Sequence, residues 1–409
     1  MEPFPVEAPA QEPYGAPPPG GPAPAAVTGM IRIAYLIDAM VSDTAGTEKY
    51  LIETIKRLDR TIFEPYLIVL APSRFIDAAE LPCPVYVLRY KGFFKSNFFS
   101  VVRELASLLR EYRFHLVQTF FEDSIFVGWL AVVAGRIDTV LLSSRRDVGL
   151  GGSVPWYHRL YRMALPLVNR RFQGIIANSL AVKEHVVRQE KTPGRKVTVV
   201  YNGVGNMSGY AQRPGLMGEA PADFWIVMVA NLRPVKGIDV FLRALGILRQ
   251  AVPTLRFKAV VIGDGPQRDS LQGLTEELHL TSHVVFAGRT KDPVAFLRHA
   301  HVGVLSSDRE GFSNAILEYM SCGLPVVATA VGGNPELVDE SNGYCVPPRD
   351  HAALALALGR LAADADLRNA MGTASLEKAR RYSWERSITC LEGYYMQLLT
   401  DPLADGGRP

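Results

Sequence analysis

Two glutamates eight positions apart, Glu310 and Glu318, flank a Gly-Phe-Ser-Asn turn. The apolar run 302–305 before them predicts a buried strand, and residues 313–322 predict a helix because Ala, Leu, Glu and Met favour helical backbone. Glu310 then lies where the strand ends, and Glu318 lies about one turn inside the helix. Between them the helix offers unpaired backbone N–H groups and the positive end of its dipole. This pattern suits an anion flanked by hydroxyls, as in a nucleotide sugar.

Two cations, Arg233 and Lys236, follow a predicted strand that ends at Ala230 and precede a predicted helix. Arginine offers phosphate oxygens a planar fork, whereas lysine offers a point charge. Alone, such a pair could be two exposed loop cations, and the two glutamates could be ordinary solvated carboxylates. Next to a helix N-terminus, the two cations together form a candidate anion site.

The same region continues with Cys-Gly-Leu-Pro-Val-Val-Ala-Thr at 322–329 and Gly-Gly-Asn-Pro-Glu at 332–336. With the spaced glutamates, these motifs resemble the donor-binding core of the retaining family-4 glycosyltransferases of the GT-B fold. The resemblance covers about residues 31–400 and is strongest over 224–345. It implies an α/β protein with two facing Rossmann-like doubly wound domains and a donor cleft between them.

The resemblance also implies roles for individual residues. Glu310, Arg233 and Lys236 would be catalytic: Glu310 contacts the donor sugar, and the two cations hold the diphosphate. Glu318 would accept hydrogen bonds from the ribose hydroxyls. The implied donor-binding residues are Glu318, Gly311, Phe312, Ser313, Gly46, Gly263 and Arg289. At Gly46 the family often has two glycines, but here Ala45 replaces the first.

On the acceptor side the family often carries a histidine after the fourth strand. Here Thr119 or Phe120 occupies that position, so the catalytic loop stays unassigned. In retaining enzymes of this kind the leaving phosphate itself can deprotonate the acceptor. Arg145 and Arg146 suit an anionic acceptor, such as a lipid diphosphate or an acidic sugar. The acceptor-side candidates are Gln118, Thr119, Arg145, Arg146 and Asp147.

Alternating strand-like and helical runs predict the elements that position these residues. The strands of the first half are expected near 31–37, 66–70, 85–88, 115–118, 140–143, 174–177 and 197–200. Those of the second half are expected near 224–229, 257–262, 284–286, 302–305 and 326–328. The predicted organisation is a disordered Pro/Ala-rich tail (1–28), an acceptor-side domain (29–202), a linker (203–223), a donor-binding domain (224–382) and a helix (383–401) that crosses back to the first domain.

Composition limits the remaining functions. The net charge of +3 gives no global sign of nucleic-acid binding. No apolar run reaches the roughly 18 residues of a membrane-spanning helix. The four cysteines are scattered, which favours reduced residues of a cytoplasmic protein. Residues 156–171 mix aromatic and basic side chains, so peripheral contact with the inner membrane is one interpretation, and an ordinary amphipathic helix is the other.

Neither a cofactor nor a metal is expected. Asp364 and Asp366 have an Asp-x-Asp spacing, but they lie at a predicted helix start, where acids favour the dipole. The predicted function is a retaining, metal-independent hexosyltransferase acting on a nucleotide-sugar donor and a sugar or lipid-linked acceptor, in cell-surface polysaccharide or glycolipid synthesis. A nucleotide-sugar epimerase on a related fold and a non-catalytic nucleotide-sugar-binding protein are the alternatives.

Overall fold

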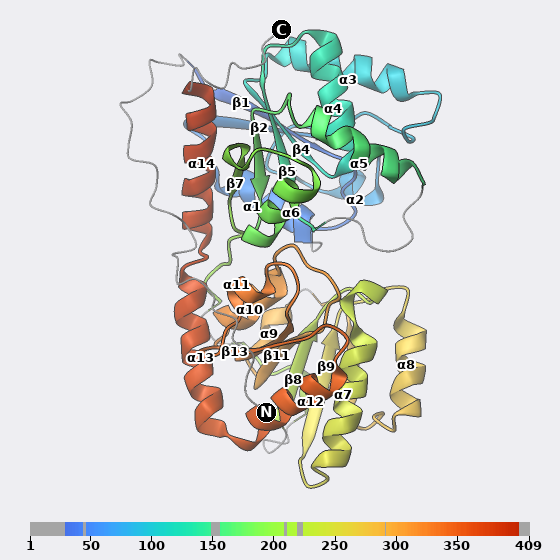
Figure 1. Cartoon of the computed structure of the whole chain (residues 1–409), viewed down its shortest axis with the longest axis vertical. Helices are drawn as coiled ribbons and strands as arrows, with labels where there is room; N and C mark the ends of the chain where they lie inside the picture. The colour runs from blue at the N-terminus through green and yellow to red at the C-terminus, as the bar shows by residue number, and fades with distance from the viewer. Residues whose placement is uncertain are drawn as a thin grey trace. The chain divides into compact units, whose positions relative to one another are not determined.

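The computed structural model describes residues 29–43, 46–148, 156–207, 211–218, 224–290 and 292–400, without the side chains of 156–159. This part of the chain forms two compact units (Figure 1). The N-terminal unit contains the described residues up to 203 together with 385–400, and the C-terminal unit contains those of 204–384. The predicted tail 1–28 lies outside the described residues.

A seven-stranded parallel sheet forms the centre of the N-terminal unit, in the order β3-β2-β1-β4-β5-β6-β7. The sequences of its strands are nearly continuous apolar runs, because helices cover both faces of a parallel sheet. They are β1 (Ile31–Ile37), β2 (Phe63–Val69), β3 (Val85–Val87), β4 (Leu116–Phe120), β5 (Val140–Arg145), β6 (Gly174–Ala177) and β7 (Val197–Val199).

Helices follow most of these strands, and the last helix of the chain joins them. They are α1 (Gly46–Arg57), α2 (Arg74–Ala78), α3 (Phe98–Tyr112), α4 (Glu122–Gly135), α5 (Trp156–Val168), α6 (Leu180–Gln189) and α14 (Trp384–Thr400), with a 3-10 turn at Gly194–Lys196. The hydroxyl of Tyr395 in α14 lies 3.2 Å from that of Tyr35 in β1 and also donates to Gln118 of β4. Helix α14 therefore packs with the N-terminal unit.

The C-terminal unit has a six-stranded parallel sheet in the order β10-β9-β8-β11-β12-β13. The strands are β8 (Phe224–Val229), β9 (Phe257–Ile262), β10 (Val284–Gly288), β11 (Val302–Leu305), β12 (Val326–Thr329) and β13 (Gly343–Val346). The predicted pair of doubly wound α/β sheets is thus confirmed. The short edge strand β13 was not predicted, because the glycine, tyrosine and cysteine at 343–345 do not form an apolar run.

The helices of the C-terminal unit are α7 (Ile238–Ala251), α8 (Arg268–Glu277), α9 (Pro293–Leu297), α10 (Asn314–Ser321), α11 (Asn334–Leu337), α12 (His351–Ala363) and α13 (Ala365–Arg380). Two 3-10 turns accompany them, at Gly215–Met217 and Pro234–Lys236. The first of these turns lies within the predicted linker 203–223, of which residues 208–210 and 219–223 are outside the described part.

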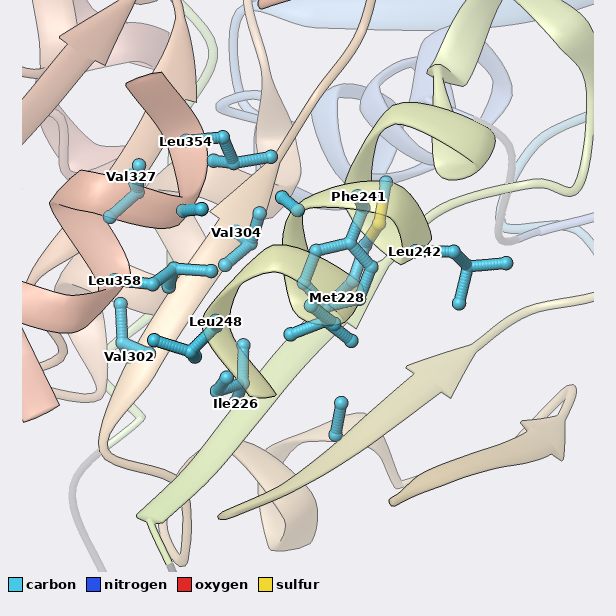
Figure 2. Packing of buried hydrophobic residues seen from close by; sticks show 14 of the residues in the cluster. Ile226, Met228, Phe241, Leu242, Leu248, Val302, Val304, Val327, Leu354 and Leu358 are labelled. Carbon is cyan, nitrogen blue, oxygen red and sulfur yellow. The ribbon is translucent and has the colours of Figure 1, made fainter. Parts of the chain in front are cut away.

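Side chains of β11 alternate between two differently packed faces. Val302 and Val304 join a core cluster with Leu248 of α7 and Leu358 of α12 (Figure 2). The intervening Gly303 faces α10, where an added Cβ would come within 2.4 Å of the Tyr319 ring. This alternation follows from the two-residue period of a strand. It fixes α10, and with it Glu318, against the sheet.

Strand order reverses next to the first strand of each sheet, between β1 and β4 and between β8 and β11. In open parallel sheets, the helices that follow the two strands at such a reversal lie on opposite faces of the sheet. Ligands bind beside the carboxyl ends of these two strands. No helix in the described ranges is both long and apolar enough to cross a membrane.

We predict that Tyr395→Ala destabilises the N-terminal unit by about 3–5 kcal/mol, because it removes a fully buried ring and its contacts with β1 and β4. Urea unfolding followed by circular dichroism measures the change. Gln397→Ala is the matched control, because Gln397 lies in the same helix and is exposed. Equal stability of the two variants would show that α14 is not anchored through Tyr395.

Candidate functional site

The donor-side residues of the C-terminal unit follow strands that all end at one edge of its sheet. Arg233 and Lys236 follow β8, Gly263 follows β9, Arg289 follows β10 and Glu310 follows β11. Because the strands are parallel, their carboxyl ends share this edge. The edge includes the reversal point between β8 and β11, so the sheet gathers at a ligand-binding position residues that are far apart in sequence.

Lys236 and Glu310 make the central polar contact of this edge. The Lys236 Nζ lies 2.5 Å from the Glu310 Oε1, and the Ser307 hydroxyl donates to the same oxygen over 2.6 Å. The side chain of Lys236 is 24% exposed and that of Glu310 is 11% exposed. A partly desolvated cation and a carboxylate are therefore already paired where an anionic ligand is expected. Ser307 was not among the predicted residues, although its position two residues after the end of β11 was a usable signal.

Two glycines let the loops around this pair approach closely. Gly237 has a φ of +58°, and a Cβ there would lie 2.1 Å from the Ser306 carbonyl oxygen. Gly332 has a φ of +53°, and its Cβ would lie 1.7 Å from the carbonyl oxygen of Glu310. Only glycine fits either position without a shift of the backbone. The Gly-Gly turn noted in the sequence thus packs closely against the loop that carries Glu310.

Helix α10 begins directly after that loop. The hydroxyl of Ser313, the N-cap residue, accepts a hydrogen bond from the backbone N–H of Ile316. Gly311 and Phe312 are buried before it, and the Phe312 ring packs against Tyr382. Glu318 is only 7% exposed, within the second turn. The helix N-terminus and both glutamates are therefore held on one short rigid segment.

The remaining donor-side candidates lie around this core. Arg233 is exposed at the start of the β8–α7 turn, and Arg289 is exposed after β10. Gly263 has a φ of +137°, and a Cβ there would lie 2.0 Å from the Ala230 carbonyl oxygen. Gly263 therefore allows the ends of β8 and β9 to meet. Gly46 begins α1 in the N-terminal unit.

Gln118 and Thr119, predicted for the acceptor side, are fully buried in β4. The amide of Gln118 donates to the Ser144 hydroxyl over 2.7 Å and accepts from Tyr395. The hydroxyl of Thr119 donates to the Leu142 carbonyl oxygen over 3.3 Å. In this structure both side chains therefore join β4 to β5, and Gln118 also joins the sheet to α14. A direct contact with an acceptor would need these bonds to break.

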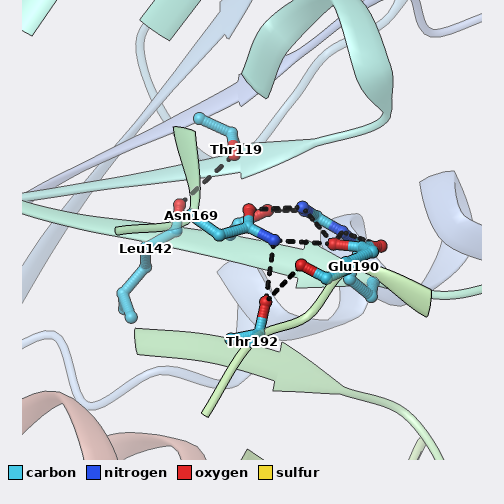
Figure 3. Close-up of polar contacts among 7 residues, drawn as sticks. Thr119, Leu142, Asn169, Glu190 and Thr192 are labelled. Atoms are coloured by element: carbon cyan, nitrogen blue, oxygen red, sulfur yellow. Dashed lines mark hydrogen bonds and ion pairs between the residues drawn. The ribbon is translucent and has the colours of Figure 1, made fainter. Parts of the chain in front are cut away.

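Arg145 is the centre of a buried polar network between β5 and the end of α6. Its guanidinium donates to both carboxylate oxygens of Glu190, over 3.0–3.2 Å, and to the amide oxygen of Asn169 over 3.0 Å. Asn169 also donates to Glu190 and to Thr192, as Figure 3 shows. Burial opposes ionisation of Glu190, but the Arg145 charge and these hydrogen bonds outweigh it and hold the pKa of Glu190 below its ordinary value. The charge of Arg145 is thus neutralised within the protein.

Arg146 and Asp147 continue past the end of β5. Arg146 is half-buried and Asp147 is exposed. The carboxyl edge of the N-terminal sheet therefore holds two consecutive arginines in different surroundings, one buried in an ion pair and one partly open to solvent.

Asp38 is a further acid at this edge that the sequence analysis did not select. It follows β1, and its carboxylate accepts from the backbone N–H of Ser124 over 2.6 Å and of Asp123 over 3.3 Å. Burial and the charge of Asp123 raise the pKa of Asp38 to about 7. The carboxyl can therefore gain or lose a proton near neutral pH, beside the strand end where a histidine was expected. Its position directly after the first strand is the feature of the sequence that could have identified Asp38 as a site residue.

Among the described residues, no group of three or more His, Cys, Asp or Glu side chains is placed to hold a metal ion. Arg233, Lys236 and the N-terminus of α10 place positive charge at the donor-side edge.

Two family models match successive parts of the chain. Residues 44–205 match the model described as Glycosyltransferase Family 4, and residues 223–364 match that described as Glycosyl transferases group 1. The two matches fall on the N-terminal and C-terminal sheets respectively.

Curated relatives include enzymes named D-inositol 3-phosphate glycosyltransferase. The Salinispora tropica protein is 33% identical over 186 residues, which span 43% of this chain and 39% of the relative. The Streptomyces scabiei protein is 26% identical over 396 residues, 88% of each chain. An N-acetyl-alpha-D-glucosaminyl L-malate synthase of Bacillus anthracis is 24% identical over 276 residues, 66% of this chain and 70% of the relative. The match to the Salinispora protein thus spans about two fifths of that relative's length.

Solved structures share the fold. Anabaena HepE in complex with UDP is 23% identical with a TM-score of 0.75, covering 90% of this chain and 100% of that one. A glycosyltransferase from Rickettsia africae is 17% identical with a TM-score of 0.77, covering 91% and 99%. Sucrose-phosphate synthase from Thermosynechococcus elongatus is 20% identical with a TM-score of 0.74, covering 90% and 99%.

We predict that Glu190→Gln lowers the free energy of unfolding by about 3–5 kcal/mol at neutral pH, because it leaves Arg145 buried without its counter-charge. Urea denaturation measures the loss. The depressed pKa of Glu190 also means that its ionised form stabilises the fold above the unfolded pKa, and this contribution is lost as pH falls through the folded pKa. The difference between the wild type and the variant should therefore shrink in acid.

The double variant Arg145→Met/Glu190→Leu separates charge from packing, since it removes both charges and keeps apolar bulk. It should recover most of the stability that Glu190→Gln loses. If the single variant loses less than about 1 kcal/mol, a value typical of exposed pairs, the network is not an essential part of the fold.

Proposed function

Because the chain belongs to glycosyltransferase family 4, we propose that it is a retaining glycosyltransferase that moves a sugar from a nucleoside-diphosphate sugar to an acceptor hydroxyl. The observation that carries this proposal is the contact between Lys236 and Glu310 at the reversal point of the C-terminal sheet. It combines a phosphate-binding cation with a hydroxyl-binding carboxylate beside a helix N-terminus. Glu318, in the second turn of that helix, supplies the acceptor for ribose hydroxyls.

Donor binding would exchange partners within this pair. The diphosphate attracts the Lys236 ammonium, and Glu310 is then available to accept hydrogen bonds from the sugar. Arg233 lies on the same turn as Lys236 and adds a second cation. Both cations stabilise the diphosphate more strongly as the bond to the sugar breaks and negative charge builds on it.

In the proposed transfer the bond between the anomeric carbon and the diphosphate oxygen breaks while the acceptor oxygen bonds to the same face of that carbon. The leaving phosphate oxygen takes the proton of the acceptor hydroxyl, so the anomeric configuration is retained. Arg233, Lys236 and the α10 N-terminus neutralise the leaving group without a metal. The structural neighbour HepE is described with UDP and UDP-glucose, which makes uridine donors the first choice for a test.

The function is tested by screening UDP-, GDP-, ADP- and TDP-sugars by thermal shift and calorimetry on the full chain. The stabilising donor is then incubated with a panel of sugar and lipid acceptors, and the anomeric configuration of the product is read by NMR. Retained configuration supports the proposal. Inverted configuration, or release of an epimerised nucleotide sugar without acceptor, contradicts it.

We predict that Glu318→Ala weakens nucleotide binding by about 10- to 150-fold, the equivalent of about 1.5–3 kcal/mol for hydrogen bonds to a charged group. The reason is the loss of the carboxylate that would accept from the ribose. Calorimetric titration with the donor's nucleoside diphosphate measures the effect. Glu277→Ala, an exposed glutamate at the end of α8, is the control. If both variants bind as tightly as the wild type, Glu318 does not contact the ribose.

We also propose that α5 contacts an anionic membrane surface, in keeping with a lipid-linked acceptor in polysaccharide or glycolipid synthesis. Leu160, Met163 and Leu167 share one face of the helix and are 50%, 78% and 60% exposed. Arg162, in the same helix, and Arg170, two residues after its end, are also exposed, while Tyr161, Leu165 and Val168 pack into the core of the unit. An exposed apolar face bordered by arginines suits the headgroup region of an anionic bilayer.

The double variant Met163→Glu/Leu167→Glu should reduce binding to phosphatidylglycerol vesicles by at least about 10-fold, because two apolar side chains are replaced by repelled carboxylates. Vesicle sedimentation measures binding, and donor affinity should stay unchanged. Leu356→Glu, at a 61% exposed leucine of α12, is the control. Equal sedimentation of the wild type and the double variant would show that α5 is not a membrane contact.

A further inference from the structure

Tyr319 lies in α10 directly after Glu318, and its side chain is fully buried. Its hydroxyl accepts a hydrogen bond from the backbone N–H of Val229 over 2.7 Å and donates to the carbonyl oxygen of Val304 over 3.1 Å. Val229 is the last residue of β8, and Val304 is the last but one of β11. One phenol oxygen therefore connects α10 to both strands at the reversal point of the sheet.

This hydroxyl continues the hydrogen-bonded ladder between β8 and β11. The two strands pair at only two positions, Ile226 with Val302 and Val227 with Gly303. Alternate residues of a parallel strand bond to the same neighbour, so the next bond would join groups two residues further along each strand. Those groups are the N–H of Val229 and the carbonyl oxygen of Val304, which are the two partners of Tyr319. A side chain of a helix thus occupies a position that belongs to the sheet.

The sheet and the phenol are matched to each other. A Cβ at Gly303 would come within 2.4 Å of the Tyr319 ring, so only glycine leaves room for the ring at this place. Burial raises the pKa of the Tyr319 hydroxyl, and the charges of Glu318 and Glu310 add to the rise. The phenol therefore keeps the proton that it donates to Val304.

The link joins two parts of the proposed donor site. Glu318, the acceptor for ribose hydroxyls, lies on α10. Lys236 lies on the turn after β8, and this turn is tied to the loop after β11 because the N–H of Asp308 donates to the Val235 carbonyl oxygen over 2.8 Å. The cation therefore belongs with the strand ends, and the ribose acceptor belongs with the helix that Tyr319 attaches to them.

This attachment gains importance when a donor binds. The contact between Lys236 and Glu310 also connects the two parts, but in the proposed function the diphosphate draws Lys236 away from Glu310. The Tyr319 hydroxyl is buried, so its bonds persist. A ligand that contacts two groups at once gains from the second contact only when the protein holds both groups at a matching distance.

We propose that Tyr319 is a positioning residue of the donor site, which holds Glu318 at a fixed distance from Arg233 and Lys236. The inference rests on the proposed function and deepens it. A nucleoside contacts the Glu318 part alone, whereas a nucleoside diphosphate spans the distance from Glu318 to the two cations. Loss of the hydroxyl should therefore weaken binding of the longer ligand selectively.

Tyr319→Phe removes the hydroxyl and keeps the ring. The probes are the tightest-binding of UDP, GDP, ADP and TDP, titrated by calorimetry, and its free nucleoside, titrated by ligand-observed NMR. We expect the dissociation constant of the nucleoside diphosphate to rise by at least about 10-fold, and that of the nucleoside to change by less than about 2-fold. A variant that is folded but only less stable would keep both constants.

Tyr395→Phe is the matched control. It also removes a fully buried phenol hydroxyl that has two partners, but this hydroxyl lies in the N-terminal unit. Both dissociation constants should equal those of the wild type. Gly303→Ala tests the link from the strand side, because its Cβ displaces the Tyr319 ring while the hydroxyl is retained. It should show the same selective loss as Tyr319→Phe, and either variant that is folded by circular dichroism decides the test.

Three outcomes overturn the proposal. The first is wild-type affinity for the nucleoside diphosphate in folded Tyr319→Phe. The second is equal weakening of nucleoside and nucleoside diphosphate, which would mean that Tyr319 supports only the nucleoside contacts. The third is the same loss in Tyr395→Phe. If the wild type binds none of the four nucleoside diphosphates, the proposed function itself fails, whereas wild-type binding with an unaffected Tyr319→Phe removes only the positioning role.

Discussion

The C-terminal unit depends on one topological constraint: strand order reverses between β8 and β11, so two adjacent strands send their chains to opposite faces of the sheet. The turn after β8 carries Lys236 and the loop after β11 carries Glu310, and the two meet over 2.5 Å. Gly237 and Gly332 make this approach possible, since a Cβ at either position would overlap a carbonyl oxygen. The glycines, serines and charges around the pair are consequences of this closeness.

The sequence predicted most of the strands because long apolar runs are local signals. It also predicted Arg233, Lys236, Glu310 and Glu318 as a group, but only because their spacing resembles a known motif. The pairing of Lys236 with Glu310 spans 74 residues, and no local pattern encodes it. The same limit explains Arg145, whose partner Glu190 lies 45 residues away. Ion pairs between residues so far apart in sequence can be identified only from the folded structure, in which the strand ends lie close together.

Arg145 and Arg146 show how far side-chain environment can diverge along two residues of a strand end. Arg145 is the last residue of β5 and Arg146 follows it directly, yet the two guanidiniums have different partners. One enters the interior, where Glu190 and Asn169 satisfy it. The other turns toward Tyr50 and keeps a buried nitrogen without an acceptor. Residue type alone could not have predicted that two consecutive arginines have such different partners.

The contact between Lys236 and Glu310 sets a thermodynamic condition on any ligand that binds there. At Lys236 and Glu310 the cation is already paired, so a ligand must replace an existing contact on both partners. A diphosphate without a sugar satisfies Lys236 but leaves Glu310 facing an anion, and a free sugar does the reverse. Only a molecule that carries both a diphosphate and a sugar offsets the loss of the contact between Lys236 and Glu310. Other ligands are disfavoured because they leave one of the two side chains without a partner. Discrimination between ligands is therefore expected to depend on the contact between Lys236 and Glu310.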